Sequence, residues 1–199
     1  MNNSNEIIIR PATAIDVPVV ASLVCAALAD EDPWRSLRPP QEEVERLLLG
    51  ALSDSQLIVM VLRDEGGAIV SAAVWDTSRE KTTNPPSYTT SLSERVVSLV
   101  SPSDADAAHL SLSLLATRPD CQRRGYAKAL ASWGVDRARK QGVPIRVRAA
   151  ARAYVLFSGM GFVDVGVVPL AVEGCVKTLL LEPKPRRRSR VAGLLSKYR

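Results

Sequence analysis

The sequence has 199 residues, of which 46% are hydrophobic and 24% charged, a balance typical of one globular domain with a sizeable core. No apolar run approaches the length of a membrane span, and the N-terminus lacks the basic segment and long apolar core of a signal peptide. The three cysteines are too few and too scattered for a disulfide framework or a zinc site. We therefore expect no bound metal, no membrane partner and a cytoplasmic protein.

The net charge is +5, but its excess lies at the C-terminal end. The last sixteen residues contain no acidic side chain and seven basic ones: Lys184, Arg186, Arg187, Arg188, Arg190, Lys197 and Arg199. The rest of the chain is therefore slightly acidic, which argues against a nucleic-acid-binding surface over the whole domain. Residues 184–199 are predicted to be a solvated basic tail, with a nuclear-import or nucleic-acid-binding segment as the alternative.

Hydrophobic periodicity predicts a strand, two helices and a two-stranded hairpin in the first 75 residues. The predicted strands are 6–10, 56–62 and 68–75, and the predicted helices are 17–28 and 39–49. Both hairpin strands are apolar almost throughout, so we expect both of their faces to be covered. On the first helix we expect Ile15, Val19 and Leu23 to share the buried face.

A polar insertion at residues 76–108 separates this part from the next strand. It contains the breaker Pro85-Pro86 and then a capping-box pattern, which predicts a loop followed by a short helix. His109, the single histidine, follows the insertion. A surface position and a general-base role are both open for it.

The most informative stretch begins after the insertion. Leu110, Leu112 and Leu114 alternate with serines, which is the period of a half-buried strand. Pro119 ends this strand, and helical spacing from residue 127 predicts a helix that stops at Gly142. Beyond it the sequence predicts a strand at 143–148, a helix at 149–160, and two strands at 163–168 and 176–182.

The turn between strand and helix has the chemistry of an anion site. A helix N-terminus offers unpaired N–H groups and a partial positive charge. Gly125 lets a ligand approach the backbone, and Arg123 and Arg124 add two formal charges. A pyrophosphate would fit this turn, and a solvated basic helix start is the alternative.

Residues 115–127, Leu-Ala-Thr-Arg-Pro-Asp-Cys-Gln-Arg-Arg-Gly-Tyr-Ala, resemble the acetyl-CoA-binding motif of the GNAT-type (acyl-CoA N-acyltransferase) superfamily. Residues 156–162, Leu-Phe-Ser-Gly-Met-Gly-Phe, resemble the family's second motif, a helix that ends in Gly-Phe. The sequence of the first motif and of the helix after it is closest to that of eukaryotic, particularly fungal, members. The resemblance implies an α/β fold, with a mixed, mostly antiparallel, twisted sheet of six to seven strands and helices on both faces. One domain would then span residues 1–183.

The resemblance implies an acetyl-CoA-dependent N-acetyltransferase of class EC 2.3.1.-. Such an enzyme transfers the acetyl group to a primary amine of a small molecule or peptide by direct attack in a ternary complex. Acetyl-CoA is the co-substrate, and a monomer and a homodimer are both compatible. The alternatives are a catalytically weak acyl-CoA-binding module and a nucleic-acid-associated protein that acts through the basic tail.

The resemblance also implies roles for single residues. The backbone of Leu115, Ala116 and Thr117 would pair with the pantetheine arm. The residues implied to hold the pyrophosphate are Gln122, Arg123, Arg124, Gly125, Tyr126, Ala127 and Lys128. Phe157 stands where many members have a tyrosine that serves as general acid, so we assign it to the cofactor site only. Tyr154 is the substitute acid, with a packing or surface tyrosine as the alternative.

One further position follows from the family pattern, and another from the sequence itself. In the superfamily the loop after the first helix often shapes the acceptor pocket, and here that loop is residues 29–35. Its acidic residues Asp30, Glu31 and Asp32 stand beside Trp34 and would suit a cationic amine, with a solvated loop as the alternative. Cys121 adjoins the turn as a candidate nucleophile, but no histidine is near it in the sequence.

Overall fold

The computed structural model describes residues 7–31, 34–77, 109–169 and 175–182. Residues 78–108 of the predicted insertion and the basic tail lie outside the described residues. The helices and strands are, in chain order, β1 (Ile8–Pro11), η1 (Ala14–Asp16), α1 (Val17–Leu28), α2 (Trp34–Leu37), α3 (Gln41–Ser53), β2 (Leu57–Arg63), β3 (Ile69–Asp76), β4 (Leu110–Thr117), η2 (Pro119–Cys121), α5 (Tyr126–Gln141), β5 (Ile145–Ala149), α6 (Ala151–Gly159), β6 (Val163–Pro169) and β7 (Cys175–Leu181). The elements predicted from periodicity in these ranges are confirmed to within a few residues.

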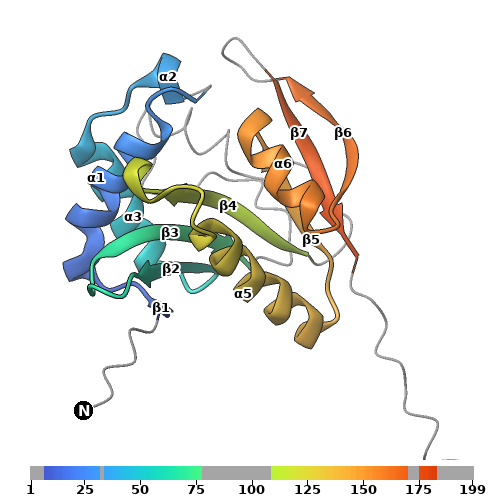
Figure 1. The fold of residues 1–199 in the computed structure, drawn as a ribbon, viewed down its shortest axis with the longest axis horizontal. Coiled ribbons are helices and arrows are strands. Elements are labelled where there is room, and N and C mark those ends of the chain that lie inside the picture. Colours follow the sequence, from blue (N-terminus) through green and yellow to red (C-terminus); the bar gives the residue numbers. More distant parts are fainter. Residues whose placement is uncertain (1–6, 32–33, 78–108, 170–174, 183–199) are drawn as a thin grey trace, which may run out of the picture.

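The strands form one seven-stranded sheet in the order β1-β2-β3-β4-β5-β7-β6 (Figure 1). Every neighbouring pair is antiparallel except β4 and β5, which are parallel. This arrangement confirms the predicted mixed, mostly antiparallel sheet. The last strand in the sequence, β7, is internal, since it pairs with β5 on one side and β6 on the other.

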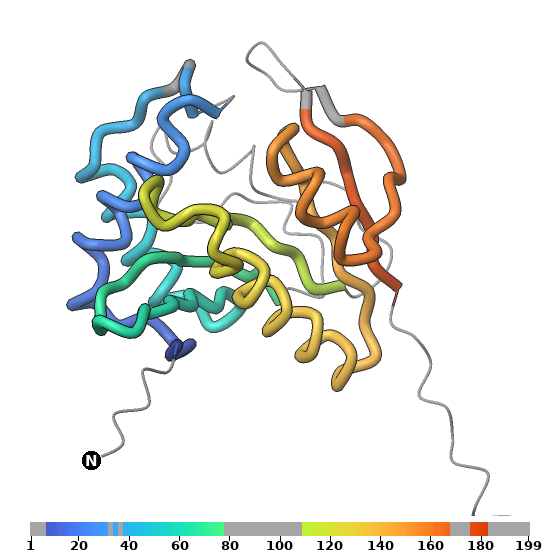
Figure 2. The backbone as a smooth tube through the Cα atoms, viewed as in Figure 1, coloured from blue at the N-terminus to red at the C-terminus, as the bar shows by residue number. Residues whose placement is uncertain are grey.

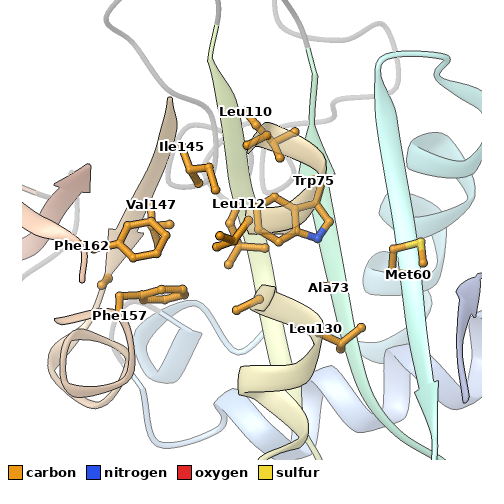
Figure 3. Packing of buried hydrophobic residues seen from close by; sticks show 14 of the residues in the cluster. Met60, Ala73, Trp75, Leu110, Leu112, Leu130, Ile145, Val147, Phe157 and Phe162 are labelled. Atoms are coloured by element: carbon orange, nitrogen blue, oxygen red, sulfur yellow. The ribbon is translucent and has the colours of Figure 1, made fainter. Parts of the chain in front are cut away.

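Helices cover both faces of the sheet and create two hydrophobic cores. One core lies between the sheet and α1 and α3, and it includes Val20, Val24 and Val44. The other lies under α5 and α6, and Figure 3 shows part of it around Trp75 and Leu130. β3 is buried along nearly its whole length, as expected for a strand between two cores.

The predicted face of α1 is wrong in part. Leu23 is buried as predicted, but Ile15 and Val19 are 89% and 51% exposed, and Val20 and Val24 are buried instead. The helix is apolar nearly all round, so periodicity alone does not define its rotation. The structure defines it through Asp16, whose buried carboxylate accepts hydrogen bonds of 2.7 Å from both terminal nitrogens of Arg10.

The alternation of Leu110, Leu112 and Leu114 predicts that these side chains share a face, and this is also wrong. Trp75 of β3 pairs with Leu112 while its neighbour Val74 pairs with Leu114, so β4 carries one additional residue at Ser113. Such a β-bulge reverses the alternation of side chains beyond it. Leu110 and Leu112 accordingly lie in the α5 core, and Leu114 packs on the α1 core.

Helix α5 is held close to β3 at one point. The buried ring of Trp75 lies against Gly134, where a side chain would overlap it. Gly142 ends the helix with φ +70°, as the sequence predicts. Within the described ranges no helix is long and apolar enough to cross a membrane.

Candidate active site

The two parallel strands in the middle of the sheet separate partway along their length. β4 and β5 pair only from Leu110 with Ile145 to Leu112 with Val147. β4 nevertheless continues to Thr117, so within the described residues its second half is paired with β3 but not with β5. The backbone edge of residues 113–117 is therefore directed into the space between the strands, where an extended ligand could add to the sheet.

A pocket of about 1050 Å³ occupies this space. Ten of the eleven predicted cofactor residues line it: Leu115, Ala116, Thr117, Gln122, Arg123, Gly125, Tyr126, Ala127, Lys128 and Phe157. Arg124 does not, since it is exposed and its guanidinium donates to the carbonyl oxygen of Asp120 at 3.4 Å. The structure thus brings Phe157 of α6 together with the strand edge and the turn of residues 115–128.

The turn after β4 is shaped by local hydrogen bonds. The Arg118 guanidinium contacts the Asp120 carboxylate at 2.7 Å and the Cys121 sulfur at 3.1 Å. The hydrogen bond from Arg118 also holds the pKa of Asp120 below its usual range. Gln122 donates through its side chain to the Thr117 carbonyl oxygen at 3.2 Å, which closes the turn back onto β4.

This turn leads into α5 through two residues with left-handed backbone. Arg123 has φ +64° and Gly125, the N-cap of α5, has φ +88°. A Cβ at Gly125 would meet no described atom within 4 Å, so the approach to the helix N-terminus is open there. The first N–H groups of a helix lack intrahelical acceptors and carry a partial positive charge. With Arg123 and Lys128 beside them, these groups fit the doubly charged pyrophosphate of a nucleotide.

The second sequence motif forms the wall of the pocket next to β5. Phe157 of α6 is 1% exposed and packs edge to face on Phe162, with ring centroids 5.2 Å apart (Figure 3). The Phe162 N–H donates to the Phe157 carbonyl oxygen at 3.1 Å, and Gly161 allows this turn with φ +89°. The Gly-Phe pair therefore fixes the end of α6. Phe157 itself has no proton to donate.

Tyr154 is not among the residues that line the pocket. Its ring lies under the Lys177 ammonium, 4.8 Å from the ring centroid, and that ammonium also contacts the Asp164 carboxylate at 2.6 Å. The hydrogen bond from Lys177 lowers the pKa of Asp164. The role of Tyr154 as a general acid stays a prediction, and the described contacts give it a packing environment. His109 is also absent from the pocket lining and precedes the opposite end of β4.

The opposite wall of the pocket comes from the end of α1 and the start of α2. Ala27, Leu28, Glu31 and Trp34 line it. Of the predicted acceptor loop, Glu31 and Trp34 therefore reach the pocket, Asp30 does not line it, and Asp32 lies outside the described residues. Figure 2 shows this part of the chain in blue and α6 in orange, on opposite sides of β4. They are joined by an ion pair of 3.0 Å between Glu31 Oε1 and Arg152 Nε. This pair could not be predicted, because residue spacing does not relate two segments that are distant in the sequence.

The comparisons with known proteins agree with this geometry. The family model described as the Acetyltransferase (GNAT) family matches residues 27–162. No curated protein matches the chain significantly. Among the described residues, no group of three or more His, Cys, Asp or Glu side chains could hold a metal ion.

Several solved structures share the fold. One, from Corynebacterium glutamicum, is described as histone acetyltransferase HPA2 and related acetyltransferase, and it has 23% identity and a TM-score of 0.67 over 89% of this chain and 97% of its own. The putative acetyltransferase yncA from Salmonella typhimurium, with acetyl-CoA bound, has 14% identity and a TM-score of 0.62 over 90% and 95%. A phosphinothricin acetyltransferase from Sinorhizobium meliloti in complex with acetyl-CoA has 18% identity and a TM-score of 0.59 over 89% and 88%.

Proposed function

The chain belongs to the acetyltransferase (GNAT) family, and from this premise we propose that it transfers the acetyl group of acetyl-CoA to a primary amine of a small molecule or peptide. The observation that carries the proposal is the pocket between the separated strands β4 and β5, which continues from the turn at Gly125 to the end of α1. Two structurally similar acetyltransferases contain acetyl-CoA, which supports the choice of acyl donor.

Each part of the pocket then has a role toward the acyl donor. The backbone of Leu115, Ala116 and Thr117 binds the amide groups of the pantetheine arm as an additional strand would. The N–H groups at the start of α5, with Arg123 and Lys128, bind the pyrophosphate. Gly125 leaves room for that approach. Arg124 has a supporting role at most, because its guanidinium contacts the Asp120 carbonyl oxygen.

The reaction requires two proton movements. The acceptor nitrogen must be neutral before it attacks the thioester carbonyl carbon, and the departing thiolate must gain a proton when the carbon–sulfur bond breaks. Backbone N–H groups along β4 would stabilise the oxyanion formed in between. Because Phe157 lines the pocket without a hydroxyl and Tyr154 does not line it, we propose that solvent supplies the proton to the thiolate. Both substrates are bound together, so no acyl-enzyme is formed and Cys121 is not needed as a nucleophile.

A second candidate is an acyl-CoA-binding module with little turnover, and the same absence of a hydroxyl at Phe157 favours it. Thiol release from acetyl-CoA in the presence of primary amines distinguishes the two. Amine-dependent release above the rate of spontaneous hydrolysis supports the transferase, and acetyl-CoA binding without release supports the module. The nucleic-acid alternative depends on residues 184–199, which lie outside the described residues. We retain one domain over residues 1–183 as part of the proposal.

A further inference from the structure

The pocket contains one carboxylate among the described residues that line it, Glu31. Its side chain is 18% exposed, and its partner across the pocket, Arg152, is 69% exposed. The ion pair is therefore asymmetric in exposure: both side chains line the pocket, but the carboxylate is largely covered and the guanidinium is mostly exposed to solvent. A largely covered carboxylate requires a positively charged partner. Because Arg152 is exposed to solvent, its contact is weak, and another cation can readily take its place beside Glu31.

The chemistry of the reaction restricts what the replacing cation can be. An amine must be neutral at the moment of attack, so the reacting nitrogen cannot keep a stable ionic contact with Glu31 through the reaction. A positive charge that Glu31 binds throughout must therefore belong to a second group of the acceptor. Trp34 lines the same wall, and an aromatic face is a favourable surface for an organic cation.

We propose, on the basis of the proposed function, that Glu31 determines acceptor specificity by binding a second positive charge of the acceptor, and that Arg152 occupies this position when the acceptor is absent. The acceptor is then a small diamine or polyamine, with one neutral amine at the thioester and one ammonium group at Glu31. Arg152 is a competitor for Glu31 in this arrangement and does not contact the reacting atoms.

Because Arg152 and the acceptor compete for Glu31, removing Glu31 and removing Arg152 should change the binding of the diamine in opposite directions. Removing the carboxylate removes the binding partner of the second ammonium, whereas removing the guanidinium leaves Glu31 available to it. If the ion pair merely held the segment after α1 against α6, loss of either partner would open the pocket in the same way. The two single variants Glu31→Gln and Arg152→Gln therefore separate a specificity determinant from a structural contact.

The experiment compares 1,4-diaminobutane with n-butylamine, which differ by the second ammonium group. Their binding is measured by ligand-detected NMR to the wild-type protein and both variants, with and without CoA, and Glu42→Gln on the exposed surface of α3 serves as the control. We expect the wild type to prefer the diamine by about tenfold, the strength of one charge-assisted contact. Glu31→Gln abolishes this preference, Arg152→Gln increases it severalfold, and Glu42→Gln leaves it unchanged.

Three results would overturn the inference: no preference in the wild type, a preference that survives in Glu31→Gln, or a decrease in both variants. The kcat of Glu31→Gln for each amine distinguishes a catalytic role of Glu31 from a role in specificity. If Glu31→Gln lowers kcat equally for both amines, the carboxylate acts as a base and not in specificity. Failure of the protein to bind CoA would instead count against the proposed function, and the amine comparison without CoA still decides the inference.

Discussion

Gly134 of α5 lies directly against the indole ring of Trp75 of β3, and a Cβ at this glycine would overlap the ring. Trp75 is fully buried and cannot move aside without displacing other core residues. We expect Gly134→Ala to lower the free energy of unfolding by about 1–3 kcal/mol, the usual cost of overpacking a core. Denaturant unfolding followed by fluorescence would measure the change.

Gly159→Ala is the matched control for this substitution. Gly159 is also helical, in α6, but a Cβ there meets no described atom within 4 Å. Alanine has the higher helix propensity, so this variant should be as stable as the wild type or up to about 1 kcal/mol more stable. Equal losses in both variants would mean that α5 does not approach the sheet as closely as described.

The contact between Arg10 and Asp16 predicts a pH-dependent stability. Hydrogen bonds from Arg10 are the main cause that lowers the pKa of Asp16 below its usual range, and the Thr13 N–H adds another at 2.8 Å. Because this pKa is lower in the folded than in the unfolded chain, its stabilising contribution is complete above the unfolded pKa of about 3.9. The contribution is lost as the pH falls below that value toward the folded pKa.

Asp16→Asn should therefore lower the free energy of unfolding at pH 7 by about 2–3 kcal/mol, because it leaves Arg10 without its buried partner. The variant should also lose less stability than the wild type as the pH falls below about 3.9. Asp136→Asn is the control, since its pair with Arg139 is exposed on both sides and is worth less than about 1 kcal/mol. Identical acid profiles for the wild type and Asp16→Asn would contradict this account.

The position of Tyr154 predicts the result of removing its hydroxyl. Its ring lies under Lys177 and does not line the pocket, so Tyr154→Phe should change kcat less than threefold, whereas loss of a general acid costs about 10²-fold or more. Steady-state thiol release at saturating acetyl-CoA would measure it. A decrease of two orders of magnitude would restore the assignment of Tyr154 as the acid.

Phe157 provides the complementary test. Phe157→Tyr adds a hydroxyl to a side chain that does line the pocket, so we expect kcat to rise by about tenfold if proton transfer to the thiolate limits turnover. Phe157→Leu keeps an apolar side chain there and should not increase kcat. If the wild type and Phe157→Tyr have the same kcat, proton transfer to the thiolate does not limit turnover.

The order of most elements could be predicted from the sequence because they have a clear period or a clear stop, such as Pro119 and Gly142. The errors arose where one period was ambiguous or interrupted. α1 is apolar nearly all round, so its buried face depends on the contact of Asp16 with Arg10 of another element. The bulge at Ser113 adds a residue without any signal in the sequence. The alternation of leucine and serine therefore predicts Leu114 on the same face as Leu112, which is wrong.

The parts of the candidate site that consist of local sequence motifs could be predicted, and the contacts between distant segments could not. The turn at Gly125 and the Gly-Phe end of α6 are local features, in which neighbouring residues determine the geometry. The pair of Glu31 with Arg152 is a tertiary contact between the segment after α1 and helix α6, and no local pattern specifies it. The motif thus predicted the proposed donor side, and the family pattern predicted the loop of the proposed acceptor side, but only the structure shows that Glu31 of this loop pairs with Arg152.

The central claim is that the turn at Gly125 binds the pyrophosphate of acetyl-CoA, and calorimetric titration of acetyl-CoA tests it most directly. The variants are Gly125→Glu and Gly142→Glu, at opposite ends of α5, where both glycines have left-handed backbone and open space around them. The backbone strain is thus matched, and only Gly125 lines the pocket. We predict that the wild type and Gly142→Glu bind acetyl-CoA and that Gly125→Glu binds it at least tenfold more weakly, about 1.4 kcal/mol. Failure of the folded wild type to bind, or equal binding by both variants, would contradict the account.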